Sequence, residues 1–322
     1  MNKPTPISAR ECAERLLSLR APVIVTHTRP DGDTVGSAAA LVLAMRSLGK
    51  DSRLATPDKI PERLAFLTEG VPLAAAGEGE EFVAIDVASP TQLGSLSGLS
   101  FKLTIDHHAR STPFSDHFTV PDTSSAAEVL YEVLTELEGI SDFKLDAAMA
   151  YRIYAAMSSD TGGFIYSNAG AKTHRIAADL IDYGIDFADI NHRLFNSKSE
   201  AQIRAEGYVA SRLRCALDGK VSYATLPRRE REELSLSLSD FESAIDIVRA
   251  KLGTKIAFFV RENDDGTMRA SLRSTGFNVA DIAECFGGGG HIRAAGCSPV
   301  AETADEAAEM IIKEIKNKYK EN

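Results

Sequence analysis

The sequence predicts an α/β protein whose N-terminal part is built on a mostly parallel sheet with helices on both faces. Short β-branched runs alternate there with longer helical patterns, which is typical of parallel βαβ units. The predicted strands are almost wholly apolar, as expected for strands covered on both sides. Because the chain has 322 residues, which is more than one hydrophobic core usually organises, we also expect a second domain.

The first predicted strand is APVIVTH, residues 21–27. A helix follows from Thr34 to Leu48 and stops at Gly49, where glycine easily adopts the left-handed cap. Two further strands cover residues 81–89 and 101–108, and each runs through apolar residues to a terminal acid. This order of elements predicts a Rossmann-like parallel sheet.

The helices that follow complete the first predicted domain, residues 1–184. Ser125 and Glu128 have the spacing of a capping box that opens a helix. A second helix is predicted from about Leu145 to Ser158. Together with the strands, these helices supply the layers of the first domain.

The second half of the chain has a different pattern. Residues 185–217 are polar and helical in pattern, and we interpret them as a helical linker. The remaining residues, 218–322, predict a smaller α+β domain. Within it, the strands 255–263 and 267–274 are joined by Asp-Asp-Gly and form a predicted β-hairpin.

The charge of the chain limits its partners. Lys and Arg number 36 against 46 Asp and Glu, a formal net charge of −10, which argues against tight binding of long nucleic acid. Short or small phosphorylated ligands need only a local basic pocket. No apolar run reaches the roughly 20 residues that cross a bilayer, and residues 1–17 do not read as a secretion signal. We therefore expect a cytoplasmic enzyme.

Acidic and histidine side chains gather at the ends of the predicted strands and helices. Carboxyl ends of parallel strands meet at one edge of a sheet, where ligands bind. Residues far apart in the sequence would therefore converge there. The candidate residues are His27, Asp31, Asp33, Asp86, Asp106, His107, His108 and Asp160.

This combination of side chains predicts a site for two divalent metal ions. Crowded carboxylates repel one another unless cations neutralise them. Mixed carboxylate and imidazole ligation suits Mn²⁺ better than Mg²⁺, with Co²⁺ as a further option. Two ions about 3.5–4 Å apart can activate a water and stabilise a phosphoryl displacement. The alternative is that each acid alone is a helix cap or a turn residue; their joint placement favours the metal site.

Four segments carry a resemblance to a known family. Residues 27–37 (HTRPDGDTVGS), 84–89 (AIDVAS), 105–108 (IDHH) and 159–164 (SDTGGF) resemble the four successive motifs of the DHH phosphoesterase superfamily. The resemblance implies that His27, Asp31 and Asp86 hold one metal and that Asp33, Asp86, His107 and Asp160 hold the other. It also implies that Asp106 orients the two histidines and that His108 faces the substrate phosphate.

The predicted second domain contains a glycine run, Gly287 to Gly290, which is too glycine-rich for a helix or a strand interior. Consecutive N–H groups in such a loop can form an anion-binding nest, although a plain connector is an equal alternative. The segments 271–274 and 278–296 resemble the DHH-associated domain that binds the nucleotide part of the substrate. The candidate substrate-binding residues are Arg273, Ser274, Gly288, Gly289, Gly290, His291 and Arg293.

With both domains in this order, the chain resembles the nanoRNase group of bifunctional oligoribonucleases and 3'-phosphoadenosine 5'-phosphate phosphatases. That group implies exonucleolytic release of mononucleotides from short RNA, with the polarity open, and conversion of 3'-phosphoadenosine 5'-phosphate to AMP. A phosphodiesterase for cyclic di-AMP or pApA and a non-catalytic nucleotide sensor are the alternatives. The oligomeric state stays open, with a homodimer as one option.

Overall fold

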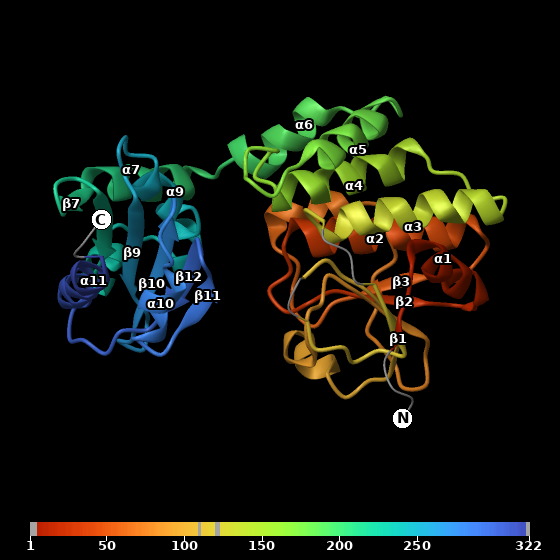
Figure 1. Cartoon of the computed structure of the whole chain (residues 1–322), viewed down its shortest axis with the longest axis horizontal. Helices are drawn as coiled ribbons and strands as arrows, with labels where there is room; N and C mark the ends of the chain where they lie inside the picture. Colours follow the sequence, from red (N-terminus) through yellow and green to blue (C-terminus); the bar gives the residue numbers. More distant parts are fainter. Residues whose placement is uncertain (1–4, 109–110, 120–122, 320–322) are drawn as a thin grey trace. The chain divides into compact units, whose positions relative to one another are not determined.

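A computed structural model describes residues 5–108, 111–119 and 123–319 of the chain. The chain divides into two compact units, Met1–Ser197 and Lys198–Asn322 (Figure 1). Each unit contains its own sheet. Among the described residues, no helix is long and apolar enough to span a membrane.

The first unit contains the predicted parallel sheet. All its strand pairs are parallel, in the order β1-β6-β5-β4-β2-β3. This confirms the predicted fold class. The strands are β1 (Thr5–Pro6), β2 (Val23–Val25), β3 (Arg53–Ala55), β4 (Phe82–Ile85), β5 (Phe101–Ile105) and β6 (His117–Phe118).

The α-helices of this unit cover one face of the sheet (Figure 1). They are α1 (Ala9–Ser18), α2 (Gly32–Ser47), α3 (Ala126–Ile140), α4 (Ala147–Asp160), α5 (Ala171–Ile181) and α6 (Phe187–Asn191), with the 3-10 helix η1 (Glu62–Thr68) on the same core and the π-turn η3 (His192–Asn196) after α6. The other face packs a smaller apolar cluster against the 3-10 helix η2 (Pro90–Leu96) and adjoining loops. In the described part of the chain, this second face is therefore covered by a short 3-10 helix and loops, whereas the first face is covered by α-helices.

The second unit is a mixed sheet between two helical layers. The strand order is β11-β12-β10-β9-β8-β7, with only β8 and β9 parallel among the described pairs. One face packs on α10 and α11, and the other packs on α7 and α9. The elements are α7 (Glu200–Ser211), β7 (Arg214–Ala216), β8 (Val221–Leu226), α8 (Arg228–Glu233), η4 (Leu238–Phe241), α9 (Ala244–Arg249), β9 (Ile256–Glu262), β10 (Met268–Ser274), α10 (Ala280–Glu284), β11 (Gly289–His291), β12 (Ala294–Cys297) and α11 (Ala304–Lys318).

The glycine run of this unit corrects one expectation. Gly289 and Gly290 lie in the three-residue edge strand β11, so the prediction that the run is too glycine-rich for a strand interior is wrong at Gly290. A Cβ added at Gly288 would lie 2.1 Å from the carbonyl oxygen of Gly296, and one at Gly290 would lie 2.5 Å from that of Ala294. The glycines therefore allow a close approach of backbone, as expected, but the partner in the structure is the neighbouring strand β12.

Candidate metal site and nucleotide-binding elements

The topology of the first unit places three short segments at one edge of its sheet. His27 follows β2, Asp86 follows β4 and Asp106 follows β5, and these strands are neighbours in the order β5-β4-β2. The Asp86 N–H donates to the carbonyl of Ile105 at 2.9 Å, which fixes the ends of β4 and β5 side by side. Because parallel strands share one carboxyl edge, the side chains that leave these strands converge.

Two helix ends bring further carboxylates to the same place. The Asp31 carboxylate caps α2 by accepting hydrogen bonds from the N–H groups of Asp33 and Thr34, both at 3.1 Å. Asp160 is the last residue of α4. A Cβ added at Gly32 would lie 2.3 Å from the Ser159 hydroxyl oxygen, so only glycine lets the start of α2 pack this closely against the end of α4.

One group of possible ligands consists of His27, Asp31 and Asp86, whose donor atoms lie within 4.8 Å of one another. The His27 Nε2 atom lies 3.3 Å from Asp86 Oδ2 and 3.7 Å from Asp31 Oδ1. The other ring nitrogen, Nδ1, lies 2.7 Å from the Thr28 carbonyl. A proton on Nδ1 would satisfy that carbonyl and leave Nε2 free to bind a metal.

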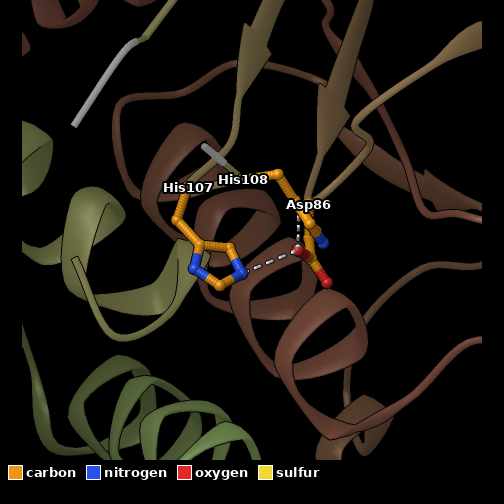
Figure 2. A group of neighbouring side chains, drawn as sticks. All are labelled: Asp86, His107 and His108. Atoms are coloured by element: carbon orange, nitrogen blue, oxygen red, sulfur yellow. Dashed lines mark ion pairs between the residues drawn. The ribbon is translucent and has the colours of Figure 1, made fainter. Parts of the chain in front are cut away.

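A second group lies beside the first and includes Asp33, His107 and Asp160. The His107 Nε2 atom lies 3.6 Å from Asp160 Oδ2 and 3.5 Å from Asp86 Oδ1. Figure 2 shows the ion pairs of both His107 and His108 with the Asp86 carboxylate, and the His108 Nδ1 atom lies 3.6 Å from Asp86 Oδ1. Asp86 thus stands between the two groups, as a shared ligand must.

The state of Asp86 tests whether these residues suit a cation. Its side chain is 3% exposed, and its Oδ1 atom has no hydrogen-bond partner among the described residues. Its backbone has a left-handed φ of 59°, a strained conformation for a residue other than glycine. Burial raises the pKa of Asp86, as does the charge of Asp31, while His27 and His107 lower it. A buried carboxylate on a strained backbone, with one oxygen that accepts no hydrogen bond from the described residues, is suited to a cation.

The other carboxylates show the same effect of crowding. Burial, followed by the charge of Asp86, raises the pKa of Asp160 to about 7. Burial and the charges of Asp86 and Asp160 also raise the pKa of Asp33 well above its usual value. Asp33 additionally accepts hydrogen bonds from the N–H groups of Ala126 and Ala127 at 2.7 and 3.0 Å. Two cations would neutralise this concentration of negative charge, and the mixed oxygen and nitrogen donors fit divalent transition metals.

The two adjacent histidines are held by different partners. His108 Nδ1 lies 2.7 Å from Asp106 Oδ1, whereas His107 Nδ1 lies 3.3 Å from the Thr123 carbonyl. Asp106 therefore contacts the His108 ring, while the Nδ1 atom of His107 lies at a backbone carbonyl. The backbone carbonyl of Thr123 was not predicted, because a main-chain acceptor leaves no signature in the sequence. The hydrogen bond to Asp106, opposed by burial, raises the pKa of His108 to about 9.

The candidate substrate-binding residues of the second unit lie on or next to β10 and β11, the two strands that flank β12. Arg273 on β10 and His291 on β11 are both register partners of Ala294 on β12. Register partners share a face of a sheet, so these two basic side chains flank Ala294 on one face. Ser274 N–H donates to the Arg293 carbonyl at 3.1 Å, which ties the end of β10 to the loop between β11 and β12. The predicted glycines Gly288, Gly289 and Gly290 lead into or form β11.

Family models match both units of the chain. The DHH family, N-terminal domain, matches residues 22–157. The DHHA1 domain matches residues 218–317.

Full-length relatives share both parts. A "Bifunctional oligoribonuclease and PAP phosphatase NrnA" of Thermus thermophilus is 30% identical over 95% of this chain and 93% of that protein. The protein of the same name in Bacillus subtilis is 27% identical over 88% of this chain and 91% of its own length. A "Cyclic-di-AMP phosphodiesterase GdpP" of Bacillus subtilis is 25% identical, but the match covers only 50% of that protein.

Solved structures agree with these matches. An exopolyphosphatase-related protein from Bacteroides fragilis has a TM-score of 0.86 at 25% identity and covers 97% of each chain. RecJ from Thermus thermophilus in complex with Mn²⁺ has a TM-score of 0.58 at 14% identity and covers 96% of this chain and 55% of that one. The second likeness concerns the fold alone.

Proposed function

Since this chain belongs to the DHH family of phosphoesterases and carries a DHHA1 domain, we propose that it hydrolyses short oligoribonucleotides to mononucleotides and 3'-phosphoadenosine 5'-phosphate to AMP. The observation that carries the proposal is the position of Asp86 between two groups of possible ligands, as a buried carboxylate whose Oδ1 atom accepts no hydrogen bond from the described residues. The relative from Thermus thermophilus, whose name states both activities, supports the choice of substrates.

We assign the ligands of two divalent ions to the two groups. His27, Asp31 and Asp86 hold one ion, and Asp33, Asp86, His107 and Asp160 hold the other. The mixture of imidazole and carboxylate donors favours Mn²⁺, with Mg²⁺ or Co²⁺ as replacements. When bound, such ions supply a nucleophilic water and neutralise charge on the phosphate.

His108 and Asp106 move the proton that the leaving group requires. With Nδ1 bound to Asp106 at 2.7 Å, the ring presents Nε2 as its free position. The hydrogen bond to Asp106, which outweighs burial, raises the pKa of His108 to about 9, and the charges of Asp86 and Asp160 add to it. Cations on those two aspartates would remove their share and bring the pKa closer to neutrality. His108 is then suited to protonate the departing oxygen as a general acid.

The second unit supplies contacts to the nucleotide. Arg273 and His291 share one face beside Ala294, and arginine binds phosphate through a planar pair of N–H groups. Ser274, Arg293 and the glycines 288–290 complete the proposed binding surface. Because these basic residues lie on one local surface, that surface is suited to a short substrate even though the net charge of the chain is −10.

A panel of substrates tests the proposal. Purified protein with Mn²⁺ is incubated with a triribonucleotide, 3'-phosphoadenosine 5'-phosphate, pApA and cyclic di-AMP, and release of mononucleotides and phosphate is measured. The expected result is turnover of the triribonucleotide and of 3'-phosphoadenosine 5'-phosphate, with a higher kcat/KM than for cyclic di-AMP. Preference for the cyclic dinucleotide would assign the protein to the phosphodiesterases, and binding without turnover would make it a sensor. EDTA-treated protein is the control.

A further inference from the structure

The backbone N–H and C=O groups of Asp106 lie beyond the last residue pair of β5 and β6. Asp106 follows β5, and the pairing of β5 with β6 ends at Thr104 and Phe118. Asp106 is 5% exposed, so water reaches its N–H and C=O groups poorly. Buried backbone groups that lose their ladder partners must find others.

The hydroxyl of Thr119 replaces both missing partners. Its Oγ1 atom accepts a hydrogen bond from the Asp106 N–H at 3.0 Å and donates one to the Asp106 carbonyl at 3.0 Å. Thr119 is itself buried, and its own N–H donates to the Thr104 carbonyl at 3.1 Å. The Thr119 side chain therefore binds both the N–H and the C=O of Asp106, and Thr119 itself is hydrogen-bonded to β5.

The hydrogen bonds between Thr119 and Asp106 also affect the position of His108, the proposed general acid. Asp106 Oδ1 holds His108 Nδ1 at 2.7 Å, so a displacement of the Asp106 backbone moves the His108 ring. Proton transfer requires close and aligned atoms, and a misplacement of about 1 Å can lower a rate on the order of a hundredfold. Two side chains, those of Thr119 and Asp106, connect β5 to the His108 ring, and the Nδ1 atom of that ring also lies 3.6 Å from Asp86 Oδ1.

We propose that Thr119 is a positioning residue, which holds Asp106 and through it orients His108 toward the leaving oxygen. This inference rests on the proposed role of His108 as general acid. It assigns to Thr119 an effect on kcat and little effect on KM, since the hydrogen bonds of Thr119 join it to Asp106 and Thr104.

The chain offers a matched control two residues before Asp106. Thr104 is also buried, and its hydroxyl donates to Ser115 Oγ at 2.8 Å. Thr104→Val removes a buried hydroxyl from the same pair of segments without removing a hydrogen bond to Asp106. Thr119→Val removes the hydroxyl that holds Asp106, and Thr119→Ser keeps it.

The experiment compares these three variants with the wild-type chain in kcat and KM for 3'-phosphoadenosine 5'-phosphate and in the hydrogen-exchange rate of the Asp106 amide. For Thr119→Val we expect a kcat lower by about tenfold or more, a KM within about twofold of wild type, and faster exchange at Asp106. Thr119→Ser should restore kcat to within about threefold, and Thr104→Val should leave both kcat and the Asp106 exchange rate near wild type.

Equal losses of kcat in Thr119→Val and Thr104→Val would overturn the inference, because a general loss of stability would then explain both. A Thr119→Ser variant as slow as Thr119→Val would also overturn it. If the wild-type chain hydrolyses none of the substrates, the proposed function fails, while the exchange rates still test the contact: equal acceleration in both valine variants would refute it.

Discussion

Replacing Asp86 by asparagine should abolish activity and at the same time stabilise the metal-free protein. Burial raises the pKa of Asp86 even though His27 and His107 lower it, so its ionisation is unfavourable in the folded, metal-free state. The sign follows directly. A carboxyl whose folded pKa exceeds its unfolded pKa lowers the stability of the protein as the pH rises between the two values, and the full penalty applies above both of them.

The size of the effect follows from the burial of this group. The side chain is 3% exposed and its Oδ1 atom has no hydrogen-bond partner among the described residues. Asparagine leaves polar atoms in the same place and removes only the buried charge, and desolvation of a buried polar group costs about 1–3 kcal/mol and more when the group is charged. For a unit of this size, each kcal/mol shifts Tm by about 2–4 °C. Metal-free Asp86→Asn protein should therefore melt at least about 2 °C above metal-free wild type.

The assay is thermal unfolding with EDTA and with Mn²⁺, together with the rate of hydrolysis of 3'-phosphoadenosine 5'-phosphate. Wild type should gain stability with Mn²⁺, whereas the variant should gain little and lose at least about a thousandfold in kcat/KM. Asp116→Asn is the control, because Asp116 is a half-exposed carboxylate paired with Lys102 and should change neither quantity. A variant that keeps turnover, or that melts below wild type without metal, would refute the reasoning.

Three further predictions follow from the site. Burial and the charge of Asp86 raise the pKa of Asp160 to about 7, so protons compete with the metal for this carboxylate. The apparent Mn²⁺ affinity, measured by calorimetry, should therefore rise between pH 6 and 8 by up to about tenfold per pH unit for each proton displaced. An affinity independent of pH would contradict this. Gly32→Ala would place a Cβ 2.3 Å from Ser159 Oγ. It should lower the free energy of unfolding by about 1–3 kcal/mol and weaken Mn²⁺ binding. Gly139→Ala on α3 is the control, because its Cβ would meet no atom within 4 Å, and it should be neutral or stabilising by up to about 1 kcal/mol. His108→Gln should lower kcat by about 10²–10⁴-fold while bound Mn²⁺, measured by metal analysis, stays at the wild-type amount; loss of metal would instead make His108 a ligand.

The fold of the first unit could be predicted from the sequence because its central strands are runs of mostly apolar residues. β2, β4 and β5 are each almost completely buried, and a run of apolar residues is what burial on both faces requires. The two-residue strands β1 and β6 are too short for any periodicity to show. The candidate metal residues were identified because their segments follow such strands or border helices and resemble the DHH motifs. The shared carboxyl edge of the strands brings His27, Asp86 and Asp106 together, and the ends of α2 and α4 add the other carboxylates.

Contacts made by backbone atoms could not be predicted in this way. The Thr123 carbonyl beside His107 and the Asp106 backbone held by Thr119 depend on where the chain returns after β6. The glycines of β11 illustrate the opposite case. Their sequence correctly indicated a close approach of backbone, but whether a ligand or a strand approaches is decided by tertiary pairing, and the structure pairs them with β12.

The most direct test of the central claim is the number and the magnetic coupling of Mn²⁺ ions bound to the chain, measured by metal analysis and electron paramagnetic resonance. Two ions that share Asp86 would lie about 3.5–4 Å apart and should give two Mn²⁺ per chain with an exchange-coupled spectrum. Asp86→Asn should lose the coupled signal. One ion per chain, or two ions with the spectrum of isolated Mn²⁺, would contradict a two-metal site bridged by Asp86.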